Sequence, residues 1–359
     1  RDVRAALEGH GYVVNPADVC VFNYVDTYGR QCTALVHVDD LLVTASSDET
    51  LDTVLRMLKH HYGEVTVMRG DRHEYLGAMW DFTQEGEVNV SMDRYVDTLL
   101  QESGVDGTAT TPAKDELFER VGEDGGQVDP PTREWFHSLV ARLLYLAKIL
   151  RRECLTAVAY LSTRVTCATR GDVEKLRRLV RYLRATRTLG LRLRVGEMGV
   201  CVTAAADAAY AVHSDRKSHT GGALMVGGGS CVLAKSAKQR IVTKSSTEAE
   251  LVAASDFVNC AYGLQKFLRG QGYAVPPIRV LQDNTSTIAL LAKGRPTSDR
   301  SRHIDVRYFW LSEREKLGEV VIDHLRTDRM GAANCLTKPL QGDQFVRERS
   351  ELQGMSKAL

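Results

Sequence analysis

The residues best suited to chemistry in this sequence are carboxylates set beside apolar runs. Asp39 and Asp40 stand side by side in "ALVHVDDLLVTAS", between two stretches that each predict a strand. Ionised carboxylates are costly to bury without a partner. Two interpretations are open at this point. The pair forms an Asp-rich hairpin turn, or it forms a hairpin tip whose oxygens hold a hard cation such as Mg²⁺.

A second set of acids lies in the C-terminal half. Asp207 closes "GVCVTAAAD", Glu250 falls in the first turns of a predicted helix, and Asp283 closes "IRVLQD". Acids at strand ends can converge at one sheet edge and hold two divalent metals for phosphodiester hydrolysis. A turn residue, helix-start charge preference and a helix cap are the simpler interpretations. Glu248 fits an S-x-x-E capping box with Ser245, which leaves Glu250 available for another role.

Basic residues are concentrated between 142 and 194, where 14 Lys and Arg accompany three Asp and Glu, although the whole chain has a net charge of +1. In "GDVEKLRRLVRYLRATR", Arg177, Arg181 and Arg184 share one face of the predicted helix. A solvated charged face is one interpretation. The local excess of positive charge favours the other, which is contact with nucleic-acid phosphates.

The predicted elements position these residues. In the N-terminal part we expect two strands around the Asp pair, a helix over 47–63, a strand–turn–strand unit and a helix from about Asp93. Residues 107–131, rich in Gly, Pro, Thr and acids, predict a linker before two or three helices. The C-terminal part then predicts three strands, a long helix, a strand, two helices and a final strand, which is typical of a mixed sheet.

Composition sets outer limits on the protein class. A length of 359 residues predicts two or three domains, and no apolar run approaches the ~20 residues that span a bilayer. None of the eight cysteines forms a C-x-x-C pair, which argues against a zinc site and favours a reducing, intracellular compartment. A cytoplasmic particle and the nucleus are both compatible. The start lacks Met, and we expect the chain to be part of a longer protein.

Longer motifs carry a resemblance to a known family. In chain order they are "DAAYA", "DRKSHTGG", "SSTEAE", "QDNTSTI" and "RHIDVRYF". Together they closely resemble the ribonuclease H domain of copia-type retrotransposon Pol polyproteins. Upstream, "VHVDDLLV" resembles the catalytic hairpin of the same family's reverse transcriptase, and "FHSLVARLLYLAKILRRECLTAVAYLSTRV" resembles the helical segment that joins polymerase to ribonuclease H.

The resemblance implies an α+β chain in four parts. They are the C-terminal part of a reverse-transcriptase palm (1–110), a linker with a basic helical thumb or connection segment (111–195), a ribonuclease-H-like domain with a mixed sheet flanked by helices (196–345), and a tail (346–359). The implied partners are RNA–DNA hybrids and the rest of the Pol polyprotein, with no membrane partner.

The resemblance also implies roles for individual residues. Asp207, Glu250 and Asp283 would bind two Mg²⁺ ions, or Mn²⁺, for hydrolysis of the RNA strand of a hybrid, with Asn334 at the fourth catalytic position. Asp39 and Asp40 would be metal ligands of the polymerase. Arg302, His303 and Arg307, in "RHIDVRYF", would contact the hybrid together with the basic helix.

Three departures from the family pattern keep an alternative open. His37 replaces the tyrosine before V-D-D, and Asn334 in "ANCLTK" replaces the fourth carboxylate. The upstream polymerase regions are absent from this chain, so we do not expect polymerase activity from it alone. The sequence therefore predicts ribonuclease H activity, intact or impaired, or a nucleic-acid-binding remnant without catalysis.

Overall fold

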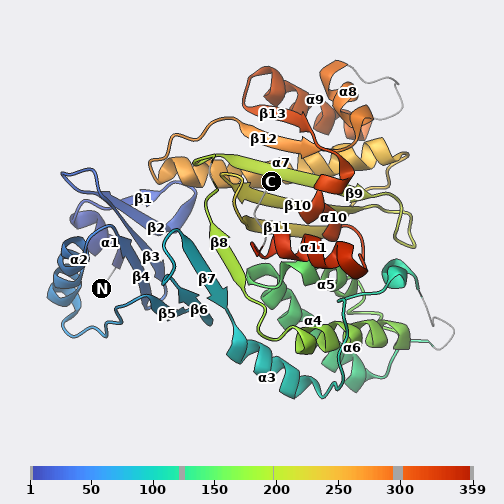
Figure 1. Cartoon of the computed structure of the whole chain (residues 1–359), viewed down its shortest axis with the longest axis horizontal. Coiled ribbons are helices and arrows are strands. Elements are labelled where there is room, and N and C mark those ends of the chain that lie inside the picture. The colour runs from blue at the N-terminus through green and yellow to red at the C-terminus, as the bar shows by residue number, and fades with distance from the viewer. Residues whose placement is uncertain (1–2, 121–125, 197, 294–301, 356–359) are drawn as a thin grey trace.

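The computed structural model describes residues 3–120, 126–196, 198–293 and 302–355. Its described residues form three sheets, one near the N-terminus, one in the middle of the molecule and one in the C-terminal half (Figure 1). Helices flank these sheets and form a separate layer below the C-terminal sheet in the figure. The predicted mixed α+β class is confirmed.

The N-terminal sheet is antiparallel, in the order β1-β2-β3-β4. Its strands are β1 (Val13–Asn15), β2 (Asp18–Val25), β3 (Gln31–His37) and β4 (Asp40–Ala45). Helices α1 (Val3–Gly9) and α2 (Asp48–Tyr62) contribute apolar side chains to one core with this sheet. The Ser47 hydroxyl accepts a hydrogen bond from the Thr50 amide and caps α2. The predicted strands around the Asp pair and the predicted helix after them are confirmed.

The middle sheet joins segments that are far apart in sequence. Its order is β5-β6-β7-β8, with β5 (Arg72–Tyr75), β6 (Ala78–Asp81), β7 (Glu87–Ser91) and β8 (Leu191–Arg194). Strand β8 pairs with β7 although about a hundred residues separate them. Helix α3 (Asp93–Ser103) follows β7 and begins where the sequence predicts it.

The helical layer lies between β7 and β8 in the chain. It comprises η1 (Asp115–Phe118), α4 (Pro130–Ile149), η3 (Arg152–Cys154), α5 (Leu155–Ser162) and α6 (Arg170–Ala185). Helix α6 starts at a capping box formed by Thr169 and Asp172. Within the segment predicted as a linker, Leu117 and Phe118 are buried in the main core. The part of the segment around Leu117 and Phe118 is therefore packed against the protein rather than extended between domains.

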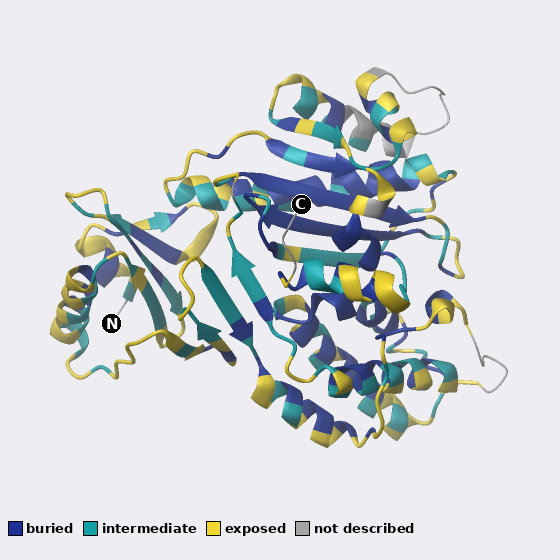
Figure 2. Ribbon diagram, in the orientation of Figure 1, coloured by how far each residue is buried: buried dark blue, intermediate teal, exposed yellow. Residues whose placement is uncertain are grey.

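The C-terminal sheet has the order β11-β10-β9-β12-β13. Strands β9 (Val202–Ala209), β10 (His219–Val226) and β11 (Cys231–Lys238) are antiparallel, whereas β12 (Ile278–Gln282) and β13 (Val320–His324) run parallel to β9. The helices of this half are α7 (Ser246–Gly270), α8 (Thr285–Lys293), α9 (Arg302–Lys316), η4 (Thr327–Arg329), α10 (Gly331–Cys335) and α11 (Gly342–Leu352). Every residue of β9 and β10 is buried, because helices cover both faces (Figure 2).

Two adjacent glycines in β10 let the helices approach the sheet closely. Successive residues of a strand point to opposite faces. A Cβ on Gly222 would lie 2.6 Å from the ring of Phe257 in α7, and one on Gly221 would lie 2.8 Å from the backbone of Leu336, just after α10. Gly221 is also the pairing partner of Asp207. The absence of two side chains thus brings α7 and the α10 segment close to Asp207 from opposite faces.

Two expected boundaries differ from the observed elements. The sequence places Asp207 at the end of a strand, which is wrong, because β9 continues through Ala209 and pairs with β10 over its whole length. The boundary expected between 345 and 346 falls inside α11, whose Phe345 and Leu352 are both buried. In the described part of the chain, no helix has the length and apolar composition that crossing a bilayer requires.

Candidate metal centre

Three carboxylates from distant parts of the chain meet beside the C-terminal sheet. Asp207 lies in β9, Glu250 in the second turn of α7, and Asp283 directly after β12. One carboxylate oxygen of each lies within 4.8 Å of the others. Strands β9 and β12 are parallel neighbours, so their carboxyl ends share one edge of the sheet. Among the described residues, this is the one group of three or more Asp, Glu, His or Cys side chains that could hold a metal ion.

The Glu250 carboxyl lies in a strongly perturbed environment. Burial raises its pKa, and the negative charges of Asp207 and Asp283 raise it further, to about 9. The Ala208 amide donates a hydrogen bond to Oε1 (3.2 Å), and the Gln282 side chain makes a longer contact with Oε2 (3.5 Å). The helix start is capped separately, since the Ser245 hydroxyl accepts from the Glu248 amide. Glu250 is therefore free to face the aspartates.

Asp207 is held from the opposite face of the sheet. Its side chain is 3% exposed. The Thr337 hydroxyl donates to its Oδ2, and the Lys338 ammonium lies 3.3 Å from the same oxygen. Both residues follow α10 directly. A carboxylate, a hydroxyl and an ammonium thus form one polar contact where the sheet meets the α10 segment.

Asn334 connects this contact to the third carboxylate. Its Oδ1 accepts from the Lys338 ammonium (3.4 Å), and its Nδ2 donates to the backbone carbonyl of Thr327 (3.0 Å). The Thr327 hydroxyl in turn donates to Asp283 Oδ2 (2.8 Å). The neutral amide thus occupies a position beside the cluster and links both aspartates through intermediate residues.

Sequence reasoning missed Thr327, Thr337 and Lys338. The spacing of the last two could have indicated them. They follow Asn334 by three and four residues in "ANCLTK", which is the spacing of neighbours on one side of a helical turn. Thr327 carries no comparable local signal. Its contact with Asp283 joins residues 44 positions apart and exists only in the folded chain.

The donor set suits hard divalent cations. All three side chains offer oxygen atoms, which Mg²⁺ and Mn²⁺ prefer over nitrogen and sulfur ligands. Burial of two of the three carboxylates leaves their mutual repulsion poorly screened. A bound dication would relieve that repulsion, so the residues fit the metal that the sequence predicts.

The other predicted metal residues, Asp39 and Asp40, lie at the tip of the β3–β4 hairpin. His37 pairs with Asp40 across a two-residue turn of Val38 and Asp39, and all four are exposed. Val38 adopts a φ of 53°, a left-handed conformation that is rare for a β-branched residue. Within the described residues, no third ligating side chain completes a cluster there. Their role in a polymerase stays a prediction.

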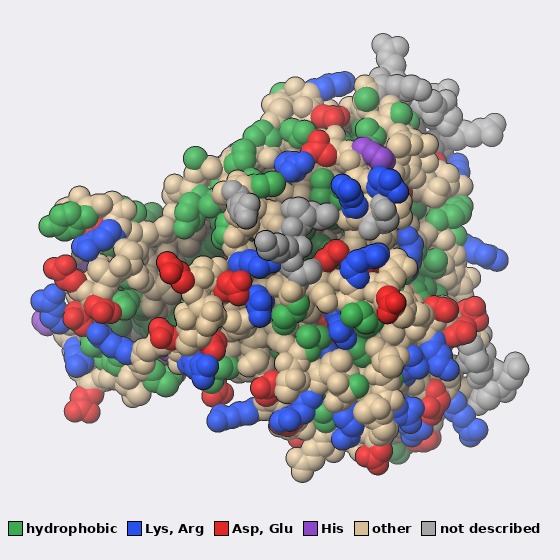
Figure 3. Space-filling view, in the orientation of Figure 1, with side chains coloured by type: hydrophobic (Ala, Val, Ile, Leu, Met, Phe, Trp, Pro, Cys, Tyr) green, Lys and Arg blue, Asp and Glu red, His purple; other side chains and the backbone are tan. Residues whose placement is uncertain are grey.

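The predicted phosphate-binding arginines of α6 each contact another group of the protein. The Arg181 guanidinium donates to the Asp106 carbonyl (2.9 Å), and Arg184 donates to the Val105 carbonyl (2.5 Å). Arg177 pairs with Glu174 on the same helix (2.7 Å). Basic and acidic side chains intermingle over the lower, helical part of the face drawn in Figure 3. Nucleic-acid binding by this face stays a prediction.

The predicted hybrid-binding residues of α9 are only partly described. Arg302 and His303 begin this helix, but their side chains lie outside the described part of the structure. Arg307 donates from Nε to Asp256 of α7 (3.1 Å). The described contact of Arg307 therefore fastens α9 to the helix that carries Glu250.

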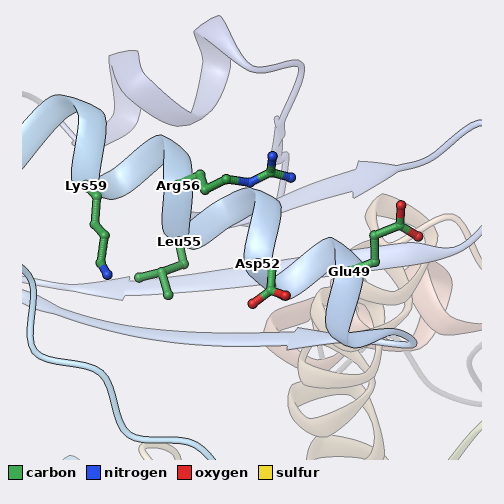
Figure 4. Close-up of a pocket in the computed structure, with 5 residues that line it drawn as sticks. All are labelled: Glu49, Asp52, Leu55, Arg56 and Lys59. Atoms are coloured by element: carbon green, nitrogen blue, oxygen red, sulfur yellow. The ribbon is translucent and has the colours of Figure 1, made fainter.

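A surface pocket of about 470 Å³ lies away from the cluster, on α2 (Figure 4). Its lining consists of side chains from this single helix: Glu49, Asp52, Leu55, Arg56 and Lys59. Asp52 pairs with Arg69. Acidic and basic side chains both line this face of the helix. The lining therefore does not favour a ligand of either charge.

Comparisons with known proteins show relatives along nearly the whole chain. The chain is 28% identical to the retrovirus-related Pol polyprotein from transposon RE1 of Arabidopsis thaliana, over 98% of this chain and 23% of the relative. It is also 28% identical to the putative transposon Ty5-1 protein of Saccharomyces cerevisiae, over 62% of this chain and 71% of the relative. No model of a known protein family matches the chain.

Among solved structures, the foamy viral protease-reverse transcriptase in complex with RNA/DNA hybrid is similar at 12% identity and a TM-score of 0.49, over 82% of this chain and 36% of that one. The sheet order β11-β10-β9-β12-β13, with helices on both faces, is the mixed sheet flanked by helices that the sequence predicts for the C-terminal half. The relatives of the chain are thus Ty5/copia-type retrotransposon Pol polyproteins, three of which match 94–98% of its length. The chain spans about a quarter of the length of the RE1 polyprotein.

Proposed function

We propose that the chain is a metal-dependent ribonuclease H that hydrolyses the RNA strand of RNA–DNA hybrids. The observation that carries the proposal is the convergence of Asp207, Glu250 and Asp283 from three separate elements. Similarity to retrotransposon Pol polyproteins along nearly the whole chain makes an RNA–DNA hybrid the expected substrate class. The 2′-hydroxyl is the chemical feature by which such an enzyme distinguishes RNA from DNA.

In this proposal the three carboxylates hold two Mg²⁺ or Mn²⁺ ions. Bound divalent cations would activate a water and stabilise the leaving oxygen in phosphodiester hydrolysis. The protein's own part is to keep the carboxylates in place. Thr337 holds Asp207, Thr327 holds Asp283, and the Ala208 amide holds one oxygen of Glu250. The raised pKa of Glu250 means that metal binding must displace its proton at neutral pH.

We further propose the organisation expected from the sequence, with residues 1–110 as the end of a reverse-transcriptase palm, 111–195 as the connecting segment and the ribonuclease H from residue 196. The tail expected from residue 346 is not proposed as a separate part, because α11 crosses that boundary. Asp39 and Asp40 would serve a polymerase only with ligands from other segments of a longer Pol protein, so this chain alone should not extend a primer. The other parts of that polyprotein are the proposed protein partners.

A second candidate function is hybrid binding without cleavage. A specific observation favours it: the position expected for a fourth carboxylate holds the neutral Asn334, and a lysine ammonium lies against Asp207. Both features reduce the negative charge available to two closely spaced dications. This candidate retains the fold and the partners and loses only the chemistry.

The test is cleavage of an end-labelled RNA–DNA hybrid at several Mg²⁺ concentrations. We expect RNA fragments from the wild type, none from Asp207→Asn, and wild-type rates from Asp48→Asn, a matched change on the exposed start of α2. Hybrid binding should survive in Asp207→Asn. A wild type that binds hybrid but leaves it intact at every Mg²⁺ concentration would support the non-cleaving candidate instead.

A further inference from the structure

The ammonium group of Lys338 lies directly against the carboxylate cluster. Its Nζ lies 3.3 Å from Asp207 Oδ2. The cluster contains three acids, two of them buried, and its members repel one another. A cation this close offsets part of the negative charge that Asp207, only 3% exposed, contributes to the cluster.

The backbone of Lys338 is anchored, whereas its ammonium group can move. Its backbone amide donates to the Asn334 carbonyl (2.9 Å) in the turn that closes α10, so the start of the side chain is anchored. Its side chain is 44% exposed, and a lysine has a flexible four-carbon stem. The ammonium can therefore turn to water without any change in the backbone.

Asn334 favours the position of the Lys338 ammonium against Asp207. Its Oδ1 contacts the ammonium at 3.4 Å, while its Nδ2 is held by the Thr327 carbonyl. A neutral amide steadies the ammonium but does not compete with Asp207 for its charge. The ammonium and a divalent cation would thus both be attracted to the same buried carboxylate.

We propose that Lys338 is a built-in counter-ion of the carboxylate cluster, which a divalent cation must displace from Asp207 in order to bind at full strength. The inference rests on the proposed function only in taking the cluster as a divalent-metal site. Lys338 thereby acts as a regulator of metal affinity: it stabilises the metal-free protein and weakens the binding of Mg²⁺.

Direct Mg²⁺ titration of the full chain by calorimetry, without nucleic acid, tests this proposal. Lys338→Met should bind Mg²⁺ about fivefold more tightly than the wild type, because a half-exposed ion pair contributes up to ~1 kcal/mol. Lys338→Arg keeps the charge and should bind as the wild type does. Lys266→Met removes a charge from the exposed side of α7, about 24 Å along the helix from Glu250, and should change nothing.

Thermal unfolding gives a second readout that a simple positioning role would not produce. Lys338→Met should unfold at a lower temperature than the wild type in EDTA and gain more from added Mg²⁺. If Lys338→Met does not fold, Lys338→Gln serves in both measurements. Unchanged or weaker Mg²⁺ binding by the charge-removing variant would overturn the proposal, since a lysine that merely orients Asp207 predicts weaker binding.

The outcomes separate this inference from the proposed function. Tighter Mg²⁺ binding by Lys338→Met, together with no hybrid cleavage by any variant, supports the counter-ion and rejects the ribonuclease activity. Mg²⁺ binding that Asp207→Asn leaves intact would place the ion elsewhere and overturn the counter-ion. If the wild type cleaves hybrid but Lys338→Met binds Mg²⁺ with unchanged affinity, the counter-ion proposal is overturned and the ribonuclease proposal stands.

Discussion

Replacing Glu250 with glutamine should remove a pH dependence of stability from the metal-free protein. The Glu250 carboxyl is buried beside Asp207 and Asp283, and these surroundings raise its pKa from 4.5 to about 9. Folding therefore binds a proton at neutral pH, whereas the unfolded chain has released it. Glutamine has nearly the same shape and no proton to lose.

The sign and size follow from this difference in proton binding. Because the folded protein holds more protons than the unfolded chain, its stability falls as the pH rises from the unfolded pKa to the folded pKa. One such proton costs about 1.4 kcal/mol per pH unit. Between pH 7 and 8.5 the wild type should lose about 2 kcal/mol that Glu250→Gln does not lose. Glu348, whose pKa burial raises to about 7, loses its remaining proton in this range in both proteins, so its contribution cancels when wild type and Glu250→Gln are compared.

The measurement is urea unfolding in EDTA at pH 7.0 and 8.5, followed by circular dichroism. Glu248→Gln is the control, since it removes a carboxyl from the first turn of the same helix, outside the cluster. Saturating Mg²⁺ should flatten the wild-type dependence, because metal binding displaces the proton. Parallel pH dependences of wild type and Glu250→Gln in EDTA would show that Glu250 is already ionised and that the electrostatic reasoning is wrong.

Three further predictions concern other contacts. Asn334→Asp should tighten Mg²⁺ binding about tenfold in calorimetry, because it adds negative charge beside the cluster. It should also lower the melting temperature of the metal-free protein, because it loses the hydrogen bond to the Thr327 carbonyl. An unchanged Mg²⁺ affinity would contradict the place of Asn334 at the site. Glu153→Gln should lower the free energy of unfolding in urea by about 3–5 kcal/mol, because Arg151 pairs with it at 0% exposure of both side chains; a loss under ~1 kcal/mol would refute this. Arg177→Gln should reduce the salt slope of hybrid binding by about one unit, and an identical slope would make its helix face merely solvated.

The sequence was a reliable guide wherever structure depends on neighbours in the chain. The apolar stripe and the Ser47 cap define α2, and the helix expected from about Asp93 is α3. The order of the sequence motifs was also a reliable guide. The strands and helices predicted from them follow one another in the C-terminal half as expected. Periodicity and capping involve residues three or four positions apart, so they can be read locally.

Contacts between distant segments required the tertiary structure. The basic face of α6 looked free in sequence, yet Arg181 and Arg184 reach the carbonyls of a loop some 75 to 79 residues earlier. The segment expected to be a linker is packed through Leu117 and Phe118 because the helical layer offers it an apolar surface. Neither contact leaves a local pattern.

The candidate site divides in the same way. Its three carboxylates were identified from motifs, but their convergence depends on parallel pairing of β9 with β12 and on α7 lying against Gly222. The contact of Lys338 with Asp207 spans 131 residues, and the Thr337 contact spans 130. Only the packing of the α10 segment against Gly221 brings them together. The sequence by itself determines which side chains are available. The distances among them arise from burial and from strand pairing, and both depend on the whole fold.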